Sequence, residues 1–252
     1  MKTIVIFNQK GGVGKTSTVI NLMSEFSSHR KKVLAIDLDA QRNLTVFCGI
    51  RDPERTVTDW LLERCSLDEI TQKTKYGYII PSDDVLEAEL LRFASIPTFV
   101  IRIKDLLSKI PDEQYDVVLI DCPPAVNQLT AAALVAADYV LIPTEAEFFS
   151  AEGVGRIAET IEQVRPLNPA IKVLGVLIVK YNPRRNLTQV LESTLEASTL
   201  RLLDCPVLKT KIRATVDVPG AQASGLCVKD YKKESKAAFD YAALYNEIKE
   251  KI

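Results

Sequence analysis

The sequence predicts an α/β fold, in which a mostly parallel, twisted sheet is covered by helices on both faces. Short apolar runs alternate with helical stretches along most of the 252 residues, the pattern of repeated strand–helix–strand units. Several of these runs are continuously aliphatic, which is typical of strands that are buried on both sides. No internal repeat, low-complexity linker or change in composition divides the chain. We therefore expect residues 1–252 to form a single domain.

Composition is that of an ordinary globular protein. Hydrophobic residues make up 47% of the chain and charged residues 26%, and the net charge is −1. No apolar run approaches the length that spans a bilayer, so we expect a cytoplasmic protein without a signal peptide. The five cysteines contain no C-x-x-C pair, and this predicts free thiols in place of a disulfide framework or a zinc site.

In the first half of the chain, runs rich in β-branched and aliphatic residues predict strands at 3–7, 32–37 and 78–81. Between them, apolar residues recur at helical spacing, which predicts helices at 16–26, 56–63, 84–91 and 97–109. Residues 38–50 follow neither period and are predicted as a loop.

The clearest strand lies at 115–121, and the two prolines that follow Cys122 forbid its continuation. Beyond it, an alanine-rich stretch and three amphipathic stretches predict helices at 128–137, 150–164, 186–195 and 234–252. Apolar runs predict further strands at 139–143 and 172–179 and a short last one at 205–208.

A glycine-rich loop lies between the first strand and the first helix, and the sequence predicts that it binds phosphate. Its glycines let successive backbone N–H groups point inward at an anion, next to the positive end of the helix dipole. Lys15 would supply a charge to the outer phosphates of a nucleotide, and the Thr16 hydroxyl would be a Mg²⁺ ligand. The predicted nucleotide-binding residues are Lys10, Gly11, Gly12, Val13, Gly14, Lys15, Thr16 and Ser17.

Acidic residues follow two of the predicted strands. Asp121 ends an apolar strand, where a P-loop protein places the carboxylate that holds Mg²⁺. Asp37 and Asp39 are alternate residues at the end of another strand, so their carboxylates should project together. Such a pair could bind metal, orient a water molecule or cap the next helix.

One departure from the standard loop pattern G-x-x-x-x-G-K-[ST] is informative. Gln9 stands where the pattern has its first glycine, and a second lysine, Lys10, follows it. This arrangement resembles the deviant P-loop of the ParA/MinD family of ATPases. The resemblance implies ATP and Mg²⁺ as cofactors and an ATP-dependent homodimer. Lys10 would be a catalytic residue that reaches the nucleotide of the partner subunit, beside the catalytic Lys15.

Within that family, the sequence most resembles the ParA branch. Asp37-Leu38-Asp39-Ala40-Gln41 is similar to the D-x-D-x-Q element of this branch. The resemblance implies that Asp39 positions the attacking water and that Asp37 supports the metal, which makes both catalytic. Asn182 lies where family members contact the adenine base.

The ParA resemblance also implies DNA binding without sequence preference. Residues 172–252 hold 14 basic and 9 acidic side chains, an excess that suits a polyanion. The predicted DNA contacts are Arg184, Arg185 and Arg213, with Lys229, Lys232, Lys233 and Lys236 as further candidates. The expected function is chromosome or plasmid segregation at the nucleoid, with a ParB-like partner that stimulates slow ATP hydrolysis.

Two alternatives have different consequences. A MinD-like ATPase would position itself on a membrane or a protein scaffold, but the tail at 239–252 mixes acids with lysines and lacks the composition of an interfacial anchor. We therefore expect no stable membrane anchor. A metabolic P-loop enzyme would instead use ATP to activate a small substrate.

Overall fold

The computed structural model describes residues 1–145, 151–183 and 187–252. Its centre is a seven-stranded sheet with the order β3-β4-β2-β5-β1-β6-β7, in which only the β3–β4 pair is antiparallel. This confirms the predicted α/β fold with a mostly parallel sheet. The strands are β1 (Lys2–Ile6), β2 (Val33–Asp37), β3 (Gln72–Thr74), β4 (Gly77–Ile80), β5 (Val117–Asp121), β6 (Tyr139–Glu145) and β7 (Lys172–Val179).

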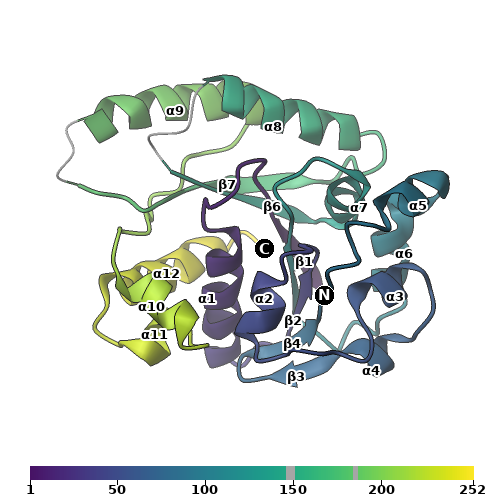
Figure 1. Ribbon diagram of the computed structural model, residues 1–252. Helices are drawn as coiled ribbons and strands as arrows, with labels where there is room; N and C mark the ends of the chain where they lie inside the picture. Colours follow the sequence, from purple (N-terminus) through teal and green to yellow (C-terminus); the bar gives the residue numbers. More distant parts are fainter. Residues whose placement is uncertain (146–150, 184–186) are drawn as a thin grey trace.

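Helices cover both faces of this sheet (Figure 1). Along β1, Ile4 and Ile6 pack on one side with α1, whereas Val5 packs on the other side with α7 and α8. This alternation buries both faces of each central strand, as continuous apolar runs require. The helices are α1 (Lys15–Ser28), α2 (Asn43–Phe47), α3 (Val57–Leu61), α4 (Leu67–Ile70), α5 (Leu90–Ser95), η1 (Phe99–Ile101), α6 (Arg102–Ser108), α7 (Gln128–Ala136), α8 (Ala151–Val164), α9 (Leu187–Leu203), α10 (Asp217–Ala223), α11 (Val228–Tyr231) and α12 (Lys236–Ile248).

Three predicted elements are wrong. The loop predicted at 38–50 contains α2, and the helix predicted at 84–91 is a bend and turn up to residue 89, because α5 begins only at Leu90. The run at 205–208 forms one isolated bridge, between Val207 and Val176, and no strand. The strand β3 and the helices α4, α10 and α11 were not predicted, and α9 runs to Leu203.

The first helix is attached to the C-terminal helices along one side. From its N-terminal end onward, Ser17 accepts a hydrogen bond from the Gln222 side chain at 2.9 Å, and Asn21 accepts one from the Val228 N–H at 2.9 Å. The Ser24 hydroxyl donates to Cys227 Sγ at 3.1 Å. Because residues 17, 21 and 24 share one face of a helix, these contacts form a continuous polar seam.

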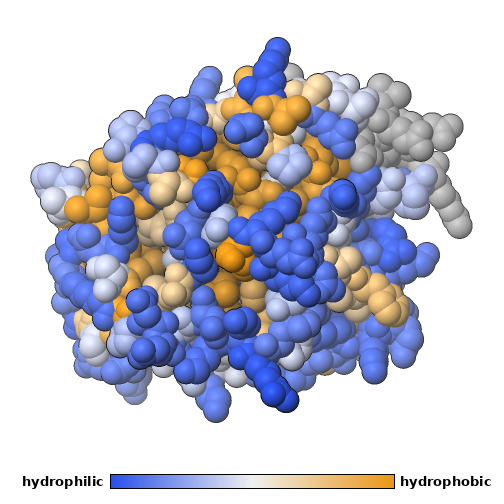
Figure 2. Space-filling model, turned by 180° about the vertical axis from the view of Figure 1, so that it is seen from behind, coloured by the Kyte–Doolittle hydropathy of each residue, from blue (hydrophilic) through white to orange (hydrophobic). Residues whose placement is uncertain are grey.

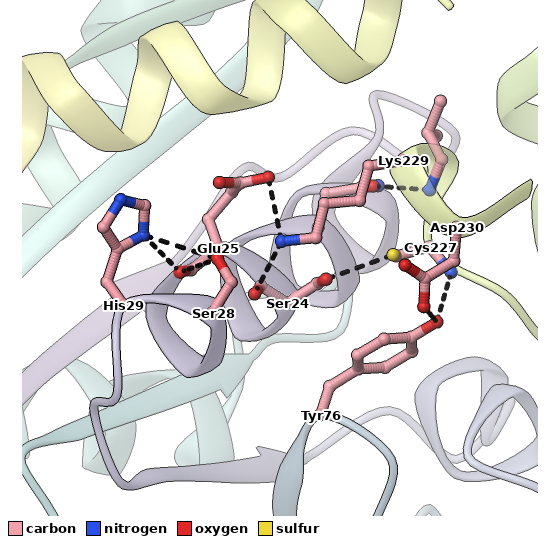
Figure 3. Close-up of polar contacts among 10 residues, drawn as sticks. Ser24, Glu25, Ser28, His29, Tyr76, Cys227, Lys229 and Asp230 are labelled. Carbon is pink, nitrogen blue, oxygen red and sulfur yellow. Dashed lines mark hydrogen bonds and ion pairs between the residues drawn. The ribbon is translucent and has the colours of Figure 1, made fainter. Parts of the chain in front are cut away.

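Further polar contacts extend this seam (Figure 3). Lys229 Nζ pairs with the buried Glu25 carboxylate at 3.3 Å and donates to the Ser24 carbonyl at 2.9 Å. On the other side of the same cluster, the Tyr76 hydroxyl donates to Asp230 at 2.8 Å. These contacts fix α11 against both α1 and the turn between β3 and β4.

The surface is mixed. On the face that Figure 2 shows, hydrophobic residues gather mainly in the upper half and hydrophilic side chains cover most of the lower half. Among the helices in the described part of the chain, none is long and apolar enough to cross a membrane.

Candidate functional site

The sheet order brings the predicted site residues to one edge. The glycine-rich loop follows β1, Asp37 ends β2 and Asp121 ends β5, and these three strands are neighbours in the order β2-β5-β1. The carboxyl ends of parallel strands meet at the same edge, which is where open α/β sheets bind ligands. A cavity of about 1070 Å³ lies there, lined by Gly11, Gly12, Gly14, Lys15, Thr16, Ser17 and Asp39 among others.

The loop has the backbone conformation that an anion cradle needs. Gly12 and Gly14 have φ angles of 74° and 78°, in the left-handed region that glycine adopts without strain. The Lys15 side chain is buried, and its Nζ donates to the carbonyl oxygens of Asn8 at 3.1 Å and Lys10 at 2.9 Å. Burial lowers the pKa of Lys15, and the nearby Asp121 carboxylate opposes this shift. The lysine thus holds the loop closed across its base.

Two residues that precede the loop fix its position. Asn8 accepts a hydrogen bond from the Lys10 N–H at 2.9 Å and donates to the Pro143 carbonyl at 2.9 Å. Gln9, which replaces the first glycine of the standard pattern, donates to the Arg156 carbonyl and the Thr160 hydroxyl of α8, both at 3.0 Å. The departure at position 9 therefore ties the loop to α8, a role for Gln9 that sequence reasoning did not assign.

Asp121 fits a metal-binding role. Its carboxylate is 1% exposed, and neither oxygen has a hydrogen-bond partner among the described residues. Burial and the neighbouring Asp37 raise its pKa well above the usual value, while the Thr16 hydroxyl and Lys15 act in the opposite direction. An unsatisfied buried carboxylate is costly. A hydrated Mg²⁺ ion, which prefers oxygen ligands, would satisfy it together with Thr16.

Asp37 and Asp39 have different surroundings. Asp37 is fully buried and accepts hydrogen bonds from the Thr45 N–H at 2.9 Å, the Thr45 hydroxyl at 2.7 Å and the Asp39 N–H at 3.1 Å. Burial raises the pKa of Asp37 to about 6, although these hydrogen bonds oppose the shift. Asp39 lines the cavity and accepts from the Gln41 N–H at 2.9 Å. Asp37 thus satisfies the first turn of α2, and Asp39 faces the open space where a water or phosphate would lie.

Two more cavity residues, Lys180 and Gln222, were missed at the sequence level. Lys180 follows β7 directly and donates to the Gly12 carbonyl at 3.0 Å. Gln222 lies on α10 and contacts Ser17. The position of Lys180 just after a buried strand could have identified it, whereas nothing near Gln222 in the sequence points to the site.

The described cavity lining does not include the other predicted residues, Lys10, Val13, Asp37, Asp121, Asn182 and Arg213. Lys10 is exposed at the start of the loop. Asn182 is exposed two residues beyond Lys180, and the described cavity lining does not include it. Arg213 forms a bidentate ion pair with Asp240, with the shortest N–O distance at 2.6 Å. Arg184 and Arg185 lie outside the described residues.

The fold and the loop geometry define a P-loop nucleotide-binding protein. The sequence pattern of the family described as "AAA domain" matches residues 1–173. The chain is 34% identical to the chromosome-partitioning ATPase Soj of Thermus thermophilus over 253 residues, covering 100% of this chain and 97% of that protein. It is 36% identical to the chromosome partitioning protein ParA of Caulobacter vibrioides over 203 residues, covering 78% and 76%. The chain therefore belongs to the ParA/Soj family of P-loop ATPases.

A solved structure supports the fold, although it is named for a different activity. One similar fold is cobyrinic acid a,c-diamide synthase from Mycobacterium smegmatis, whose structure holds ADP and magnesium. It is 28% identical, with a TM-score of 0.83 over 98% of this chain and 93% of that one.

Proposed function

We propose that this chain is a ParA-like ATPase that binds ATP with Mg²⁺, dimerises on ATP and binds DNA without sequence preference. One ATPase domain at 1–252 would perform all of this in the cytoplasm, at the nucleoid. The observation that carries the proposal is the orphaned carboxylate of Asp121 beside Lys15 and Thr16, in a chain similar to Soj along its whole length. Hydrolysis would be slow alone and stimulated by a ParB-like partner during chromosome or plasmid segregation.

Each residue of the site would have its own role in binding or hydrolysing ATP. The N–H groups of the loop from Gly11 to Ser17 would bind the phosphates, and Lys15 would neutralise the outermost ones. Thr16 and Asp121 would hold Mg²⁺, which neutralises charge on the leaving phosphates. Asp39 would orient the attacking water, and Asp37 would keep α2 in place behind it. Lys10 would approach the nucleotide of the second subunit.

The proposed DNA-binding residues lie in the C-terminal part of the chain. Arg213 is engaged by Asp240, so a phosphate would compete with that carboxylate for its guanidinium group. Lys232 and Lys229 are likewise paired, with Asp217 at 3.2 Å and Glu25 at 3.3 Å, whereas the side chains of Lys233 and Lys236 are exposed near the start of α12 and accessible to DNA phosphates. Contacts of this kind add to the salt dependence of binding and give no sequence preference.

The decisive experiment measures DNA retention with ATP, with ADP and without nucleotide across a salt series. We expect the protein to be retained on DNA with ATP but not with ADP or without nucleotide. DNA retention should fall steeply as the salt concentration rises. Equal retention in all three states would contradict the ATP switch. Binding to lipid vesicles with ATP, without DNA retention, would instead identify a MinD-like positioning ATPase, and a substrate-dependent product other than ADP and phosphate would identify a metabolic enzyme.

A further inference from the structure

A second lysine, from outside the glycine-rich loop, contacts that loop. Lys180 Nζ donates to the Gly12 carbonyl oxygen at 3.0 Å and to the Glu145 carboxylate at 2.6 Å. Glu145 is the last residue of β6, and Lys180 is the first residue after β7. One ammonium group therefore joins the ends of β6 and β7 to the glycine-rich loop.

The backbone of Lys180 is in an uncommon conformation. Its φ angle is 53°, in the left-handed region that residues other than glycine rarely adopt, and such residues concentrate at functional sites. The next residue holds it there, because the Tyr181 N–H donates to the Ile212 carbonyl at 2.9 Å and its carbonyl accepts from the Ala214 N–H at 2.9 Å. Both backbone polar groups of Tyr181, the residue that follows Lys180, are therefore held by hydrogen bonds.

The side chain is accessible to a ligand in the cavity. It is 59% exposed and belongs to the cavity lining together with Gly11, Gly12 and Gly14. Its partner Glu145 is only 19% exposed, and the pairing of β6 with β7 sets Glu145 opposite Val179. The carboxylate of this ion pair is therefore largely buried, whereas the lysine side chain is exposed to the cavity.

The contact with Gly12 has a geometric consequence for the neighbouring N–H group. In a trans peptide unit, the C=O of one residue and the N–H of the next point in opposite directions. The described part of the chain has no cis peptide bond, so holding the Gly12 carbonyl fixes the direction of the Val13 N–H. This N–H is one of the donors that the loop would offer to phosphate.

We propose that Lys180 is a positioning residue of the nucleotide site. Its ammonium group holds the Gly12–Val13 peptide unit so that the Val13 N–H is aimed at phosphate before the nucleotide arrives. Lys180 is also part of the cavity lining, and Glu145 keeps its ammonium group in place. The nucleotide half of this inference rests on the proposed function, whereas the effect on the loop exists without nucleotide.

Two measurements on four proteins test this role. Lys180→Met keeps the stem and removes the ammonium group, Glu145→Gln removes only its anchor, and Lys172→Met changes an exposed lysine at the other end of β7 as a matched control. Hydrogen exchange of the Val13 amide is measured without nucleotide, and dissociation rates are measured with fluorescent ADP and ATP.

We expect Lys180→Met to speed exchange at Val13 and to raise the nucleotide dissociation rate about tenfold, since a charge-assisted contact is lost. Glu145→Gln should raise this rate about threefold, and Lys172→Met should change neither quantity. Wild-type exchange and dissociation rates in Lys180→Met would overturn the proposal, as would equal effects in Lys172→Met. Failure of the wild-type protein to bind nucleotide would instead refute the proposed function, while the exchange measurement would still decide the role of Lys180 in the loop.

Discussion

Asp37 and Asp121 are register partners across β2 and β5, so two buried carboxylates lie side by side at the carboxyl edge of the sheet. Their surroundings differ. Asp37 accepts three hydrogen bonds, whereas neither oxygen of Asp121 has a partner in the described part of the chain. Each side chain is deprived of water, and the charge on Asp37 adds to the rise in the pKa of Asp121. The site is built to receive positive charge.

Asp121→Asn should therefore have opposite effects on stability and on metal-dependent binding. Without Mg²⁺, removal of a buried carboxylate whose oxygens have no hydrogen-bond partner among the described residues should raise the free energy of unfolding by about 1 kcal/mol, or the melting temperature by about 2–4 °C. Mg²⁺-dependent enhancement of nucleotide binding should be lost. Calorimetry and nucleotide titrations with and without Mg²⁺ measure the two effects.

Asp138→Asn provides the comparison, because the exposed Asp138 carboxylate accepts a hydrogen bond from the Thr3 N–H at 2.8 Å and an uncharged amide oxygen accepts it more weakly, so stability should fall slightly. An Asp121→Asn protein that melts below the wild type and still responds to Mg²⁺ would refute the role assigned to this carboxylate.

Gly175→Ala should destabilise the protein by about 3 kcal/mol, measured by urea unfolding. Gly175 has a φ angle of 149° at a β-bulge between β6 and β7, and a Cβ there would lie 2.8 Å from the Pro206 carbonyl and 2.7 Å from Leu208. Gly155→Ala in α8 meets nothing within 4 Å and should stabilise by up to about 1 kcal/mol. Equal effects of the two substitutions would show that the bulge tolerates a side chain.

Asp230 should give a defined pH dependence of stability. Burial raises the pKa of Asp230, but hydrogen bonds from Lys75 and Tyr76 outweigh this and lower it below the usual value. Because the pKa is lowered in the folded state, the contribution to stability is present above about pH 4 and is lost as the pH falls through the folded value.

Asp230→Asn should therefore cost about 1 kcal/mol at pH 7 and progressively less below pH 4, as followed by urea unfolding. The exposed Asp52 provides the comparison, because Asp52→Asn should leave stability nearly unchanged at both pH values. A cost for Asp230→Asn that is the same at pH 7 and pH 3 would show that the ion pair with Lys75 contributes nothing.

Lys10→Ala should separate dimerisation from nucleotide binding, if the proposed function holds. The Lys10 side chain is exposed, while its carbonyl, which alanine retains, accepts from Lys15. We expect the variant to bind ATP as a monomer and to lose the ATP-dependent dimer, measured by light scattering. Lys104→Ala, at an exposed position on α6, should dimerise like the wild type. A Lys10→Ala protein that still dimerises and hydrolyses ATP normally would exclude the cross-subunit role.

The sheet and the glycine-rich loop could be predicted from the sequence, because each depends on a local pattern. Strands such as β7 are continuous apolar runs, and the loop contains its own glycines and lysines. The helix α2 could not be predicted, since it begins after Arg42 at a φ angle of 57° and is held by Asp37 through Thr45. A search for hydrophobic periodicity does not detect such side-chain hydrogen bonds or an unusual φ angle.

The C-terminal helices show the same limit. α10 contains Pro219 and Gly220, which disfavour a helix when judged by propensity alone. Its place is set by contacts such as that between Gln222 and Ser17, which lie 205 residues apart. For the same reason the support that Gln222 gives to the site was invisible in the sequence, whereas Lys15, Thr16 and Asp121 were found by their spacing and strand-end position.

The polar seam along α1 makes the folding of the nucleotide-binding part of the chain depend on the C-terminal helices. The family pattern ends at residue 173, yet Asn21, Ser24 and Glu25 of α1 each contact a residue beyond residue 226. In a fragment that ends at residue 173, these polar groups would lose their partners. The apolar residues of α1 that pack against the C-terminal helices would also be exposed to water. We therefore expect the fragment 1–173 to fold poorly by itself and to fold better when a separate peptide that contains α10 to α12 is added.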